Sequence, residues 1–252
     1  MEITARQFNR FSKIVYHKCG INLHHGKQQL LAARLSKRMR STSISSVAEY
    51  LKILENDDQE LTHFLDAIST NHTFFFREPH HFEFLGDGHM NIWCAAASSG
   101  EEPYSLAIDC LEKGFKPAIL ATDISTVALA AAERGVYPYD KAKNVASHLL
   151  KKHFQKGNGK WEGFIRVKDE VKRMVTFRRY NLLTDPMPDL RFDVIFCRNV
   201  LIYFDNPVKE KVINKLYRVL KTKGYFIIGG AESLNNLKHH YKYIKPSIYM
   251  KI

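Results

Sequence analysis

Acidic side chains follow two short apolar runs near the middle of the chain. Glu101 and Glu102 come after the run at residues 92–96 and a turn of small residues, and they begin a predicted helix. Asp123 ends the next apolar run, 23 positions after Gly100. An acid at that place in a nucleotide-binding sheet commonly accepts hydrogen bonds from ribose hydroxyls. The two acidic sites therefore predict a nucleotide-like ligand at one edge of a sheet.

The turn before Glu101 indicates which nucleotide. Alanine and serine replace most of the glycines of a G-x-G-x-x-G cradle, so the turn is a poor match to a pyrophosphate site. Two acids would repel a pyrophosphate but could accept from the ammonium of a methionine-like group. The pattern favours S-adenosylmethionine (SAM) over a nicotinamide dinucleotide. Two alternatives stay open, because Glu102 could serve only the helix dipole and Asp123 could only cap the helix at Thr126.

Further polar residues follow the third and fourth predicted strands. Asn181 and Leu182 come after residues 175–178, and Arg198 and Asn199 come after residues 193–197. Ligands of open α/β sheets bind at these carboxyl ends of strands. The four side chains alone would not identify a ligand.

Strands and helices alternate from about residue 91 onwards, which predicts an α/β fold with a parallel sheet covered on both faces. The expected helices span residues 103–113, 126–134 and 207–221, the last one stopped by Gly224. The expected strands span residues 92–96, 118–122, 175–178, 193–197 and 225–229. Residues 241–244 and 247–252 then predict a closing antiparallel hairpin, which distinguishes a Rossmann-like, class I SAM methyltransferase sheet from a dinucleotide-binding one.

The rest of the chain predicts two further units. Residues 1–72 form a helical domain of four amphipathic helices, because apolar residues recur at helical spacing and Thr4 and Ser46 open capping boxes. Residues 73–90 form a linker that contributes to the active site, and residues 91–252 form the SAM-binding domain. An insertion at about residues 137–174 is too long for one crossover helix. We expect it to hold a small antiparallel ribbon made of residues 163–168 and 171–175.

The charge is strongly positive and unevenly spread. The 252 residues carry a formal net charge of +12, and residues 1–40 hold nine Lys or Arg against one acid. Four of them, Arg34, Lys37, Arg38 and Arg40, cluster at the end of one predicted helix without interleaved acids. This predicts a face that binds an acidic partner, although a merely solvated face is the alternative.

The composition also indicates where the protein is located and whether it binds a metal. The four cysteines lack Cys-x-x-Cys spacing, so we expect reduced thiols and no zinc site. No basic start precedes an apolar stretch, and no apolar run approaches the roughly 20 residues that span a bilayer, so we expect a cytoplasmic protein. Paired histidines such as His80 and His81 do not face each other on a helix, so we expect no metal.

Several motifs together resemble the CheR-type chemotaxis receptor glutamate O-methyltransferases over nearly the whole chain. They are T-x-F-F-R-E at residues 73–78, W-x-A-A-x-S-x-G-E-E-P-Y-S at 93–105, A-T-D-I at 121–124, N-L-L at 181–183 and F-C-R-N-V-x-I-Y-F at 196–204. The resemblance implies that SAM is surrounded by Asn71, Thr73, Arg77, Glu102, Asp123, Asn181, Leu182, Arg198 and Asn199. Arg77 and Tyr203 would be nearest the methyl acceptor. One departure is Gly229-Gly230-Ala231-Glu232, where the family usually has a Ser-Glu pair.

The resemblance also implies partners. The substrate would be the acidic methylation helices of chemoreceptors, and the products a glutamate methyl ester and S-adenosyl-L-homocysteine. In some family members the inserted β-subdomain binds a receptor C-terminal peptide as an added strand, and they carry a Gly-x-Gly loop such as Gly157-Asn158-Gly159. A Gly-Asn-Gly turn is equally expected on structural grounds alone. We expect a monomer that inserts into no membrane and binds no nucleic acid.

Three other functions remain open at this point. An RNA methyltransferase would also combine a SAM sheet with a basic domain, although an Asn-Pro-Pro-Tyr-type loop after the fourth strand is absent. A SAM-sensing adaptor would bind receptor and cofactor without transfer, but the presence of both Arg77 and Tyr203 argues against it. A small-molecule carboxyl methyltransferase would leave the basic helical face without a purpose.

Overall fold

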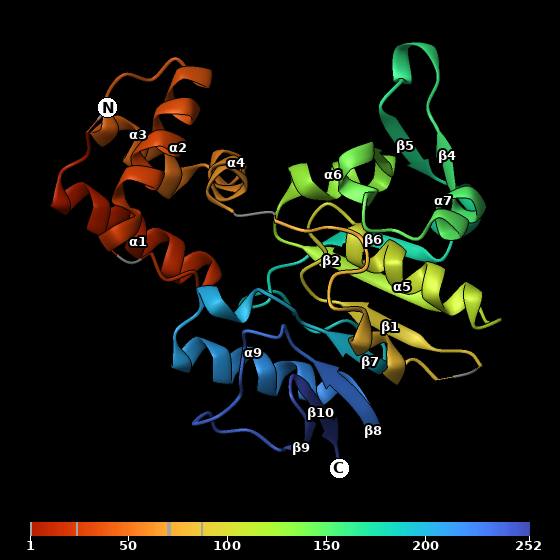
Figure 1. Cartoon of the computed structure of the whole chain (residues 1–252). Helices are drawn as coiled ribbons and strands as arrows, with labels where there is room; N and C mark the ends of the chain where they lie inside the picture. Colours follow the sequence, from red (N-terminus) through yellow and green to blue (C-terminus); the bar gives the residue numbers. More distant parts are fainter. Residues whose placement is uncertain (1, 24, 70–71, 87) are drawn as a thin grey trace.

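Four helices form the N-terminal part of the chain (Figure 1). A computed structural model describes residues 2–23, 25–69, 72–86 and 88–252. The helices are α1 (Ala5–Cys19), α2 (Gln28–Ser41), α3 (Val47–Asn56) and α4 (Asp58–Ile68). The capping box at Thr4 is confirmed, and Ser46 and Asp57 accept hydrogen bonds at the starts of α3 and α4. Their apolar faces meet in one core in which Phe11 contacts Tyr50 and Phe64.

A seven-stranded sheet follows, with the order β6-β2-β1-β7-β8-β10-β9. The strands are β1 (Asn91–Cys94), β2 (Ala118–Asp123), β6 (Val175–Arg179), β7 (Phe192–Phe196), β8 (Leu220–Ile227), β9 (Tyr241–Lys245) and β10 (Ile248–Lys251). The first five run parallel, whereas β10 pairs antiparallel with both β8 and β9. The predicted α/β fold with its closing hairpin is confirmed.

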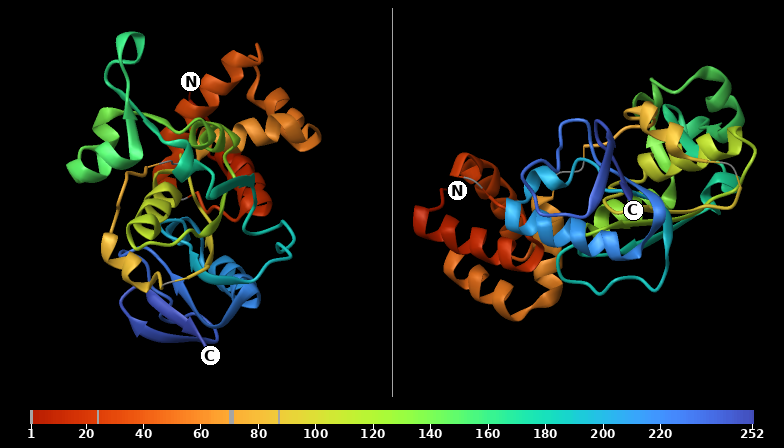
Figure 2. Two further views of the ribbon diagram at one scale, coloured as in Figure 1. Left: turned by 90° about the vertical axis from the view of Figure 1, so that its right-hand side faces the viewer. Right: turned by 90° about the horizontal axis from the view of Figure 1, so that it is seen from below.

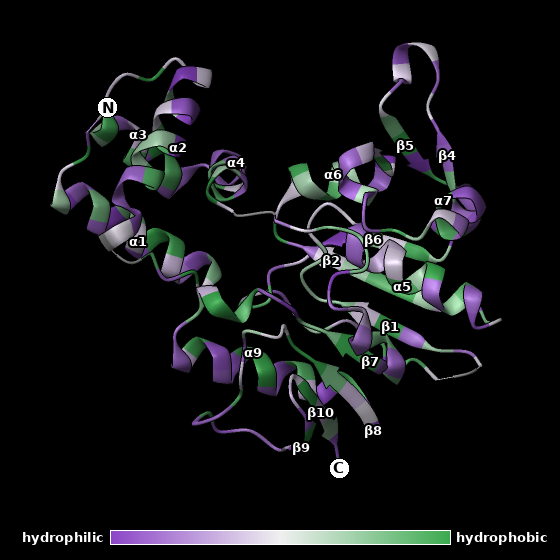
Figure 3. Cartoon of the chain, in the orientation of Figure 1, coloured by the Kyte–Doolittle hydropathy of each residue, from purple (hydrophilic) through white to green (hydrophobic). Residues whose placement is uncertain are grey.

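Helices cover both faces of this sheet. They are α5 (Glu101–Glu112), α6 (Thr126–Arg134) and α9 (Asn206–Val219). Ile92 belongs to the core on the α5 side and Trp93 to the core on the α9 side, because successive strand residues face opposite ways. Nearly all residues of β1 and β7 are buried, and hydrophobic colouring predominates along β7 (Figure 3). Such strands are typical of a parallel sheet buried on both faces.

The last helix ends earlier than its sequence predicts. The prediction extended it to residue 221 with Gly224 as the stop, but α9 ends at Val219 and β8 already begins at Leu220. Leu220 pairs with Phe192 of β7, so tertiary pairing overrides the local helical pattern. The strand order reverses between β1 and β7, which is where open α/β sheets bind their ligands.

The insertion forms a separate three-stranded sheet with the order β3-β5-β4. It contains β3 (Val136–Pro138), α7 (Ser147–His153), β4 (Phe154–Lys156), β5 (Phe164–Val167) and α8 (Asp169–Lys172). The predicted ribbon partner at residues 171–175 is wrong. Val171 lies in α8 and Val175 begins β6, because a four-residue apolar spacing also suits one helical turn. The β4–β5 hairpin projects from the body on the side away from the N-terminal helices (Figure 2).

The helical domain is tied to the sheet domain by direct hydrogen bonds. The Asp66 carboxylate of α4 accepts from the Thr126 amide at 2.7 Å and from the Thr126 hydroxyl at 2.6 Å, at the first turn of α6. Tyr16 donates to Asp205 at 2.8 Å, at the start of α9. The helical domain therefore lies against the edge of the sheet where the ligand site is expected. Within the described residues, no helix is long and apolar enough to cross a membrane.

Candidate active site

A cleft lies between the helical domain, the linker and the carboxyl ends of β1, β2 and β7. Its empty volume, including the open mouth, is about 920 Å³. Seven predicted site residues line it, namely Thr73, Arg77, Glu102, Asp123, Arg198, Asn199 and Tyr203. Asn71, which the resemblance also placed around SAM, lies outside the described residues. The structure thus brings together side chains that are up to 130 positions apart in the sequence.

A smaller, mostly apolar pocket of about 400 Å³ continues the cleft. It contains the predicted residues Asn181 and Leu182, and it shares Asp123, Val200 and Tyr203 with the main cleft. Both polar groups of the Asn181 side chain have protein partners, since the amide donates to the Lys18 carbonyl at 2.7 Å and the oxygen accepts from the Leu183 amide at 3.0 Å. Asn181 therefore forms part of the pocket wall and joins it to α1.

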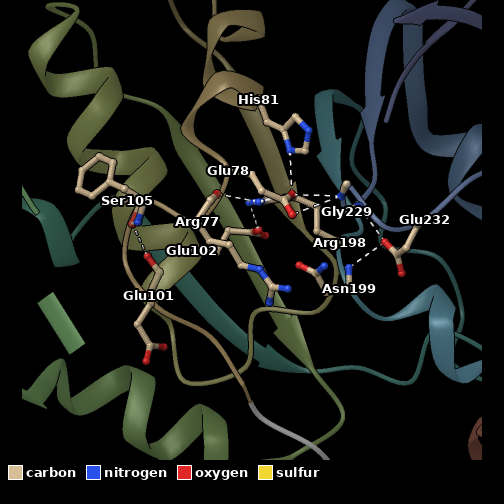
Figure 4. Close-up of polar contacts among 12 residues, drawn as sticks. Arg77, Glu78, His81, Glu101, Glu102, Ser105, Arg198, Asn199, Gly229 and Glu232 are labelled. Carbon is tan, nitrogen blue, oxygen red and sulfur yellow. Dashed lines mark hydrogen bonds and ion pairs between the residues drawn. The ribbon is translucent and has the colours of Figure 1, made fainter. Parts of the chain in front are cut away.

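Arg198 is the centre of a buried ionic network (Figure 4). Its guanidinium donates to Glu102 at 2.6 Å, to Glu78 at 2.8 Å and to the Arg77 carbonyl at 2.7 Å. Its Nε, which is also buried, has no hydrogen-bond partner among the described residues. Arg198 therefore links the linker, the start of α5 and the end of β7, and it retains one donor.

The pKa values of the two carboxylates in this network shift in opposite directions. Burial raises the pKa of Glu102 above its usual value despite the opposing charge of Arg198. Burial also disfavours the ionised form of Glu78, but the hydrogen bond from Arg198 outweighs it and lowers the pKa. Glu78 was not among the predicted site residues, although it ends the T-x-F-F-R-E motif.

Of the two acids at the start of α5, only Glu102 lines the cleft. Glu101 points away from the network and is fully buried (Figure 4). It forms an ion pair with Lys141 at 3.2 Å and accepts from the Ser99 hydroxyl at 2.7 Å. The expectation that both acids could meet a ligand ammonium is therefore wrong for Glu101. Neighbouring helix residues project about 100° apart, so they seldom face the same ligand.

Asp123 shapes the ligand turn as well as lining it. Its carboxylate accepts from the Ser98 amide at 2.8 Å and from the Ser125 amide at 2.9 Å. The alternative that Asp123 caps α6 is wrong, because the Ser125 hydroxyl fills that role by accepting from the Ala128 amide. Burial raises the pKa of the Asp123 carboxyl, and the two backbone amides oppose that shift. The carboxylate lies where the two pockets meet.

Tyr203 and Arg77 both line the cleft. Tyr203 ends the segment that follows β7, and the Lys27 ammonium lies 5.1 Å from its ring centre. Arg77 donates to the His72 carbonyl at 3.2 Å. Lys27, together with Ile21, Leu23 and Leu30, brings the helical domain into the cleft wall. The sequence prediction missed these four residues, because no local pattern signals that a distant domain will close over a sheet edge.

The four predicted basic residues of α2 do not have equal environments. Arg34, Lys37 and Arg40 are exposed. Arg38 is half-buried and forms two hydrogen bonds to Glu60, one of them 2.7 Å long. The free basic face therefore consists of Arg34, Lys37 and Arg40.

The insertion carries a groove between Arg134, Lys156, Gly157, Trp161, Arg166 and Lys172, among others. A Cβ at Gly157 would lie 2.0 Å from the Trp161 carbonyl oxygen, and Gly159 has a φ of +56°. Both glycines of the predicted loop therefore have structural reasons to be glycine.

Two family descriptions match the chain. "CheR methyltransferase, all-alpha domain" matches residues 6–69, and "CheR methyltransferase, SAM binding domain" matches residues 71–250. The chain belongs to the CheR methyltransferase family. SAM is thus the cofactor of its sheet domain, and the resemblance inferred from the motifs is confirmed.

Full-length relatives agree with this assignment. A chemotaxis protein methyltransferase of Borreliella burgdorferi is 37% identical, with 100% of this chain and 96% of that protein covered. Chemotaxis protein methyltransferase 2 of Pseudomonas aeruginosa is 37% identical, with 98% and 93% covered. The chemotaxis protein methyltransferase of Escherichia coli is 35% identical, with 99% and 92% covered.

The cleft fits SAM by its chemistry. Glu102 offers a carboxylate for an ammonium, and the buried, unpartnered Nε of Arg198 offers a donor for a carboxylate. Asp123 lies beside the apolar pocket, as a ribose next to an adenine requires. Among the described residues, no group of three or more His, Cys, Asp or Glu side chains could hold a metal ion.

Proposed function

We propose that this protein transfers a methyl group from SAM to glutamate side chains of bacterial chemoreceptors. The products would be glutamate methyl esters and S-adenosyl-L-homocysteine. The observation that carries the proposal is that Arg77, Lys27 and Tyr203, two cations and a phenol suited to a carboxylate, line the SAM cleft together. Such a substrate would place the enzyme in the cytoplasm.

We assign the cofactor contacts as follows. Glu102 accepts from the ammonium, and Arg198 and Thr73 serve the carboxylate of the methionine part. Asp123 accepts from the ribose, and Asn181 and Leu182 enclose the base, with Asn71 and Asn199 completing the contacts. When bound, SAM supplies an electrophilic methyl group on a sulfonium.

The acceptor needs no general base. A glutamate with a pKa near 4.3 is already ionised at neutral pH. Arg77 orients that carboxylate through its fork of donors, and the Tyr203 hydroxyl donates to the second oxygen. The walls from the helical domain exclude water from the carboxylate. In-line placement of the carboxylate against the methyl group, together with this exclusion of water, can lower the reaction barrier by roughly 7–11 kcal/mol. The neutral ester loses most of its attraction to Arg77, which assists release.

Two surfaces would bring the receptor to this cleft. The exposed face of Arg34, Lys37 and Arg40 attracts acidic receptor helices, and its effect should weaken as salt rises. The groove beside Gly157 and Gly159 would hold a receptor C-terminal peptide, added as a strand along the free edge of β4. The first surface selects the methylation region, and the second raises its local concentration.

The test is transfer of radiolabelled methyl from SAM to receptor-bearing membranes of the same organism. Mild base should then release the label as methanol, which is diagnostic of an ester. Base-stable label or label found only on RNA would overturn the proposal in favour of another acceptor. Binding of SAM without any label would favour an adaptor that transfers nothing.

A further inference from the structure

The segment in which this chain departs from the family motif holds a carboxylate beside the cleft. Glu232 follows β8 and lies outside the cleft walls formed by the described residues. Its Oε2 accepts from the Gly229 amide at 2.7 Å and from the Asn199 amide at 2.8 Å. Its Oε1 accepts from the Ile202 amide at 3.1 Å. One side chain therefore binds three backbone donors, two of which lie in the segment that carries Tyr203.

Glu232 serves the amides of Asn199 and Ile202, whereas the Tyr203 amide donates to the Val200 carbonyl at 3.1 Å within the turn. The segment leaves β7, passes through Asn199 with a φ of +58°, and forms the short turn Leu201–Tyr203. The first amides of such a turn have no partner inside it. Glu232 supplies partners at both ends of the bend. Figure 4 shows its contacts with Asn199 and Gly229.

The two segments also fit each other sterically. A Cβ at Gly229 would lie 2.4 Å from the side-chain nitrogen of Asn199, so a glycine is required where Asn199 packs. The Glu232 amide in turn donates to the Gly229 carbonyl at 2.9 Å, which closes a tight turn around the carboxylate. The Glu232 side chain is thus fixed from its own turn by the Gly229 amide, as well as by the two amides of the segment that it holds.

We propose that Glu232 is a positioning residue for methyl transfer, which acts by holding residues 199–203 so that Tyr203 faces the acceptor. This inference rests on the proposed function. The cofactor side of the cleft has supports besides Glu232, since Arg198 is held by Glu78 and Glu102, and Asp123 is held by Ser98. Glu78 also accepts from the Gly230 amide of the Glu232 turn, but that backbone contact does not involve the Glu232 carboxylate. Loss of the Glu232 carboxylate therefore affects turnover and leaves SAM binding largely intact.

The informative substitution is Glu232→Gln. The single oxygen of the amide can replace Oε2 and keep the bonds to Asn199 and Gly229. Its NH₂ group then faces the Ile202 amide, so two donors meet and the end of the segment next to Tyr203 is released. The matched control is Glu210→Gln, because Glu210 is also a half-buried carboxylate that accepts from a backbone amide, that of Lys238, at 2.9 Å.

Both variants are measured for kcat and KM with SAM and receptor, for SAM affinity by calorimetry, and for amide exchange. We expect Glu232→Gln to lower kcat roughly tenfold, the size of one lost charge-assisted hydrogen bond. The SAM dissociation constant should change by less than about twofold, and amide exchange should accelerate at residues 202–204 but not in β1. Glu210→Gln should change none of these quantities.

Three results would overturn the inference: an unchanged kcat, an equal loss in SAM affinity, or unchanged amide exchange at residues 202–204. A wild-type enzyme that binds SAM but methylates no receptor would instead refute the proposed function, and the role of Glu232 in turnover with it. The two failures are therefore distinguished by the wild-type measurement.

Discussion

Replacement of Arg38 by alanine should destabilise the protein, whereas replacement of its neighbours on α2 should not. Arg38 and Glu60 form an ion pair with two hydrogen bonds, and their side chains are 22% and 7% exposed. Tyr50 donates a further hydrogen bond to Glu60 at 2.6 Å. Arg34 and Arg40 are exposed and contribute charge alone.

The magnitude follows from the burial of Glu60. Removal of Arg38 leaves a buried carboxylate with Tyr50 as its remaining side-chain donor. Breaking one partner of a buried pair costs about 3–5 kcal/mol, and the partial exposure of Arg38 places this pair near the lower limit. We therefore expect the free energy of unfolding to fall by about 3 kcal/mol at pH 7. Replacement of an exposed arginine should change it by less than about 0.5 kcal/mol.

The loss should also depend on pH. Burial opposes ionisation of Glu60, but hydrogen bonds from Arg38 and Tyr50 outweigh it and lower the pKa. A carboxyl whose pKa is lowered in the folded protein stabilises the fold at pH values above its unfolded pKa of about 4.3. That stabilisation is lost as the pH falls through the folded pKa. Without Arg38 the burial dominates, so the carboxylate destabilises the fold as the pH rises. The difference between wild type and Arg38→Ala must therefore be larger at pH 7 than at pH 4.

Urea unfolding at both pH values measures this difference, and Glu60→Gln completes a double-mutant cycle. The receptor KM of an Arg34→Ala, Lys37→Ala, Arg40→Ala variant then measures the free basic face without loss of stability. A cost below about 1 kcal/mol for Arg38→Ala at pH 7, or an equal cost at pH 4, would refute the reasoning.

Three further predictions concern the cleft and its supports. Arg77→Ala should lower turnover roughly 10–100-fold while SAM affinity changes little, because one charge-assisted contact to the acceptor is lost; unchanged turnover would contradict its role. His81 is fully buried, and burial lowers its pKa to about 4. Below about pH 6.5 the unfolded chain therefore binds a proton at this histidine that the folded chain does not bind. The free energy of unfolding should fall by up to about 3 kcal/mol between pH 6.5 and 4, and His81→Gln should flatten that dependence. Asp66→Ala should remove the hydrogen bonds to Thr126, lower the free energy of unfolding by roughly 1–2 kcal/mol and weaken SAM binding. Replacement of the exposed Asp58 by alanine should have none of these effects. Equal thermal midpoints for the two variants would argue against the link.

Much of the architecture could be predicted because it depends on local patterns. The run before Glu101, the acid at residue 123 and the apolar strands predicted a parallel SAM-binding sheet, and the two final strands predicted its closing hairpin. The family resemblance of the motifs also pointed to Arg77 and Tyr203, which the structure brings to one cleft. Errors arose where a short apolar run suits both helix and strand, as at residues 171–175.

The sequence by itself determined the order of the elements, the class of cofactor and the sign of the surface charge, because each depends on residue types and near neighbours. Only the tertiary structure decided which charges are free and which are bound. Arg38 pairs with Glu60, 22 positions away, and Glu78 meets Arg198, 120 positions away. It also decided that Glu102 and not Glu101 faces the cleft. Ion pairs and packing between distant segments depend on how the domains meet in space, and no local pattern encodes that contact.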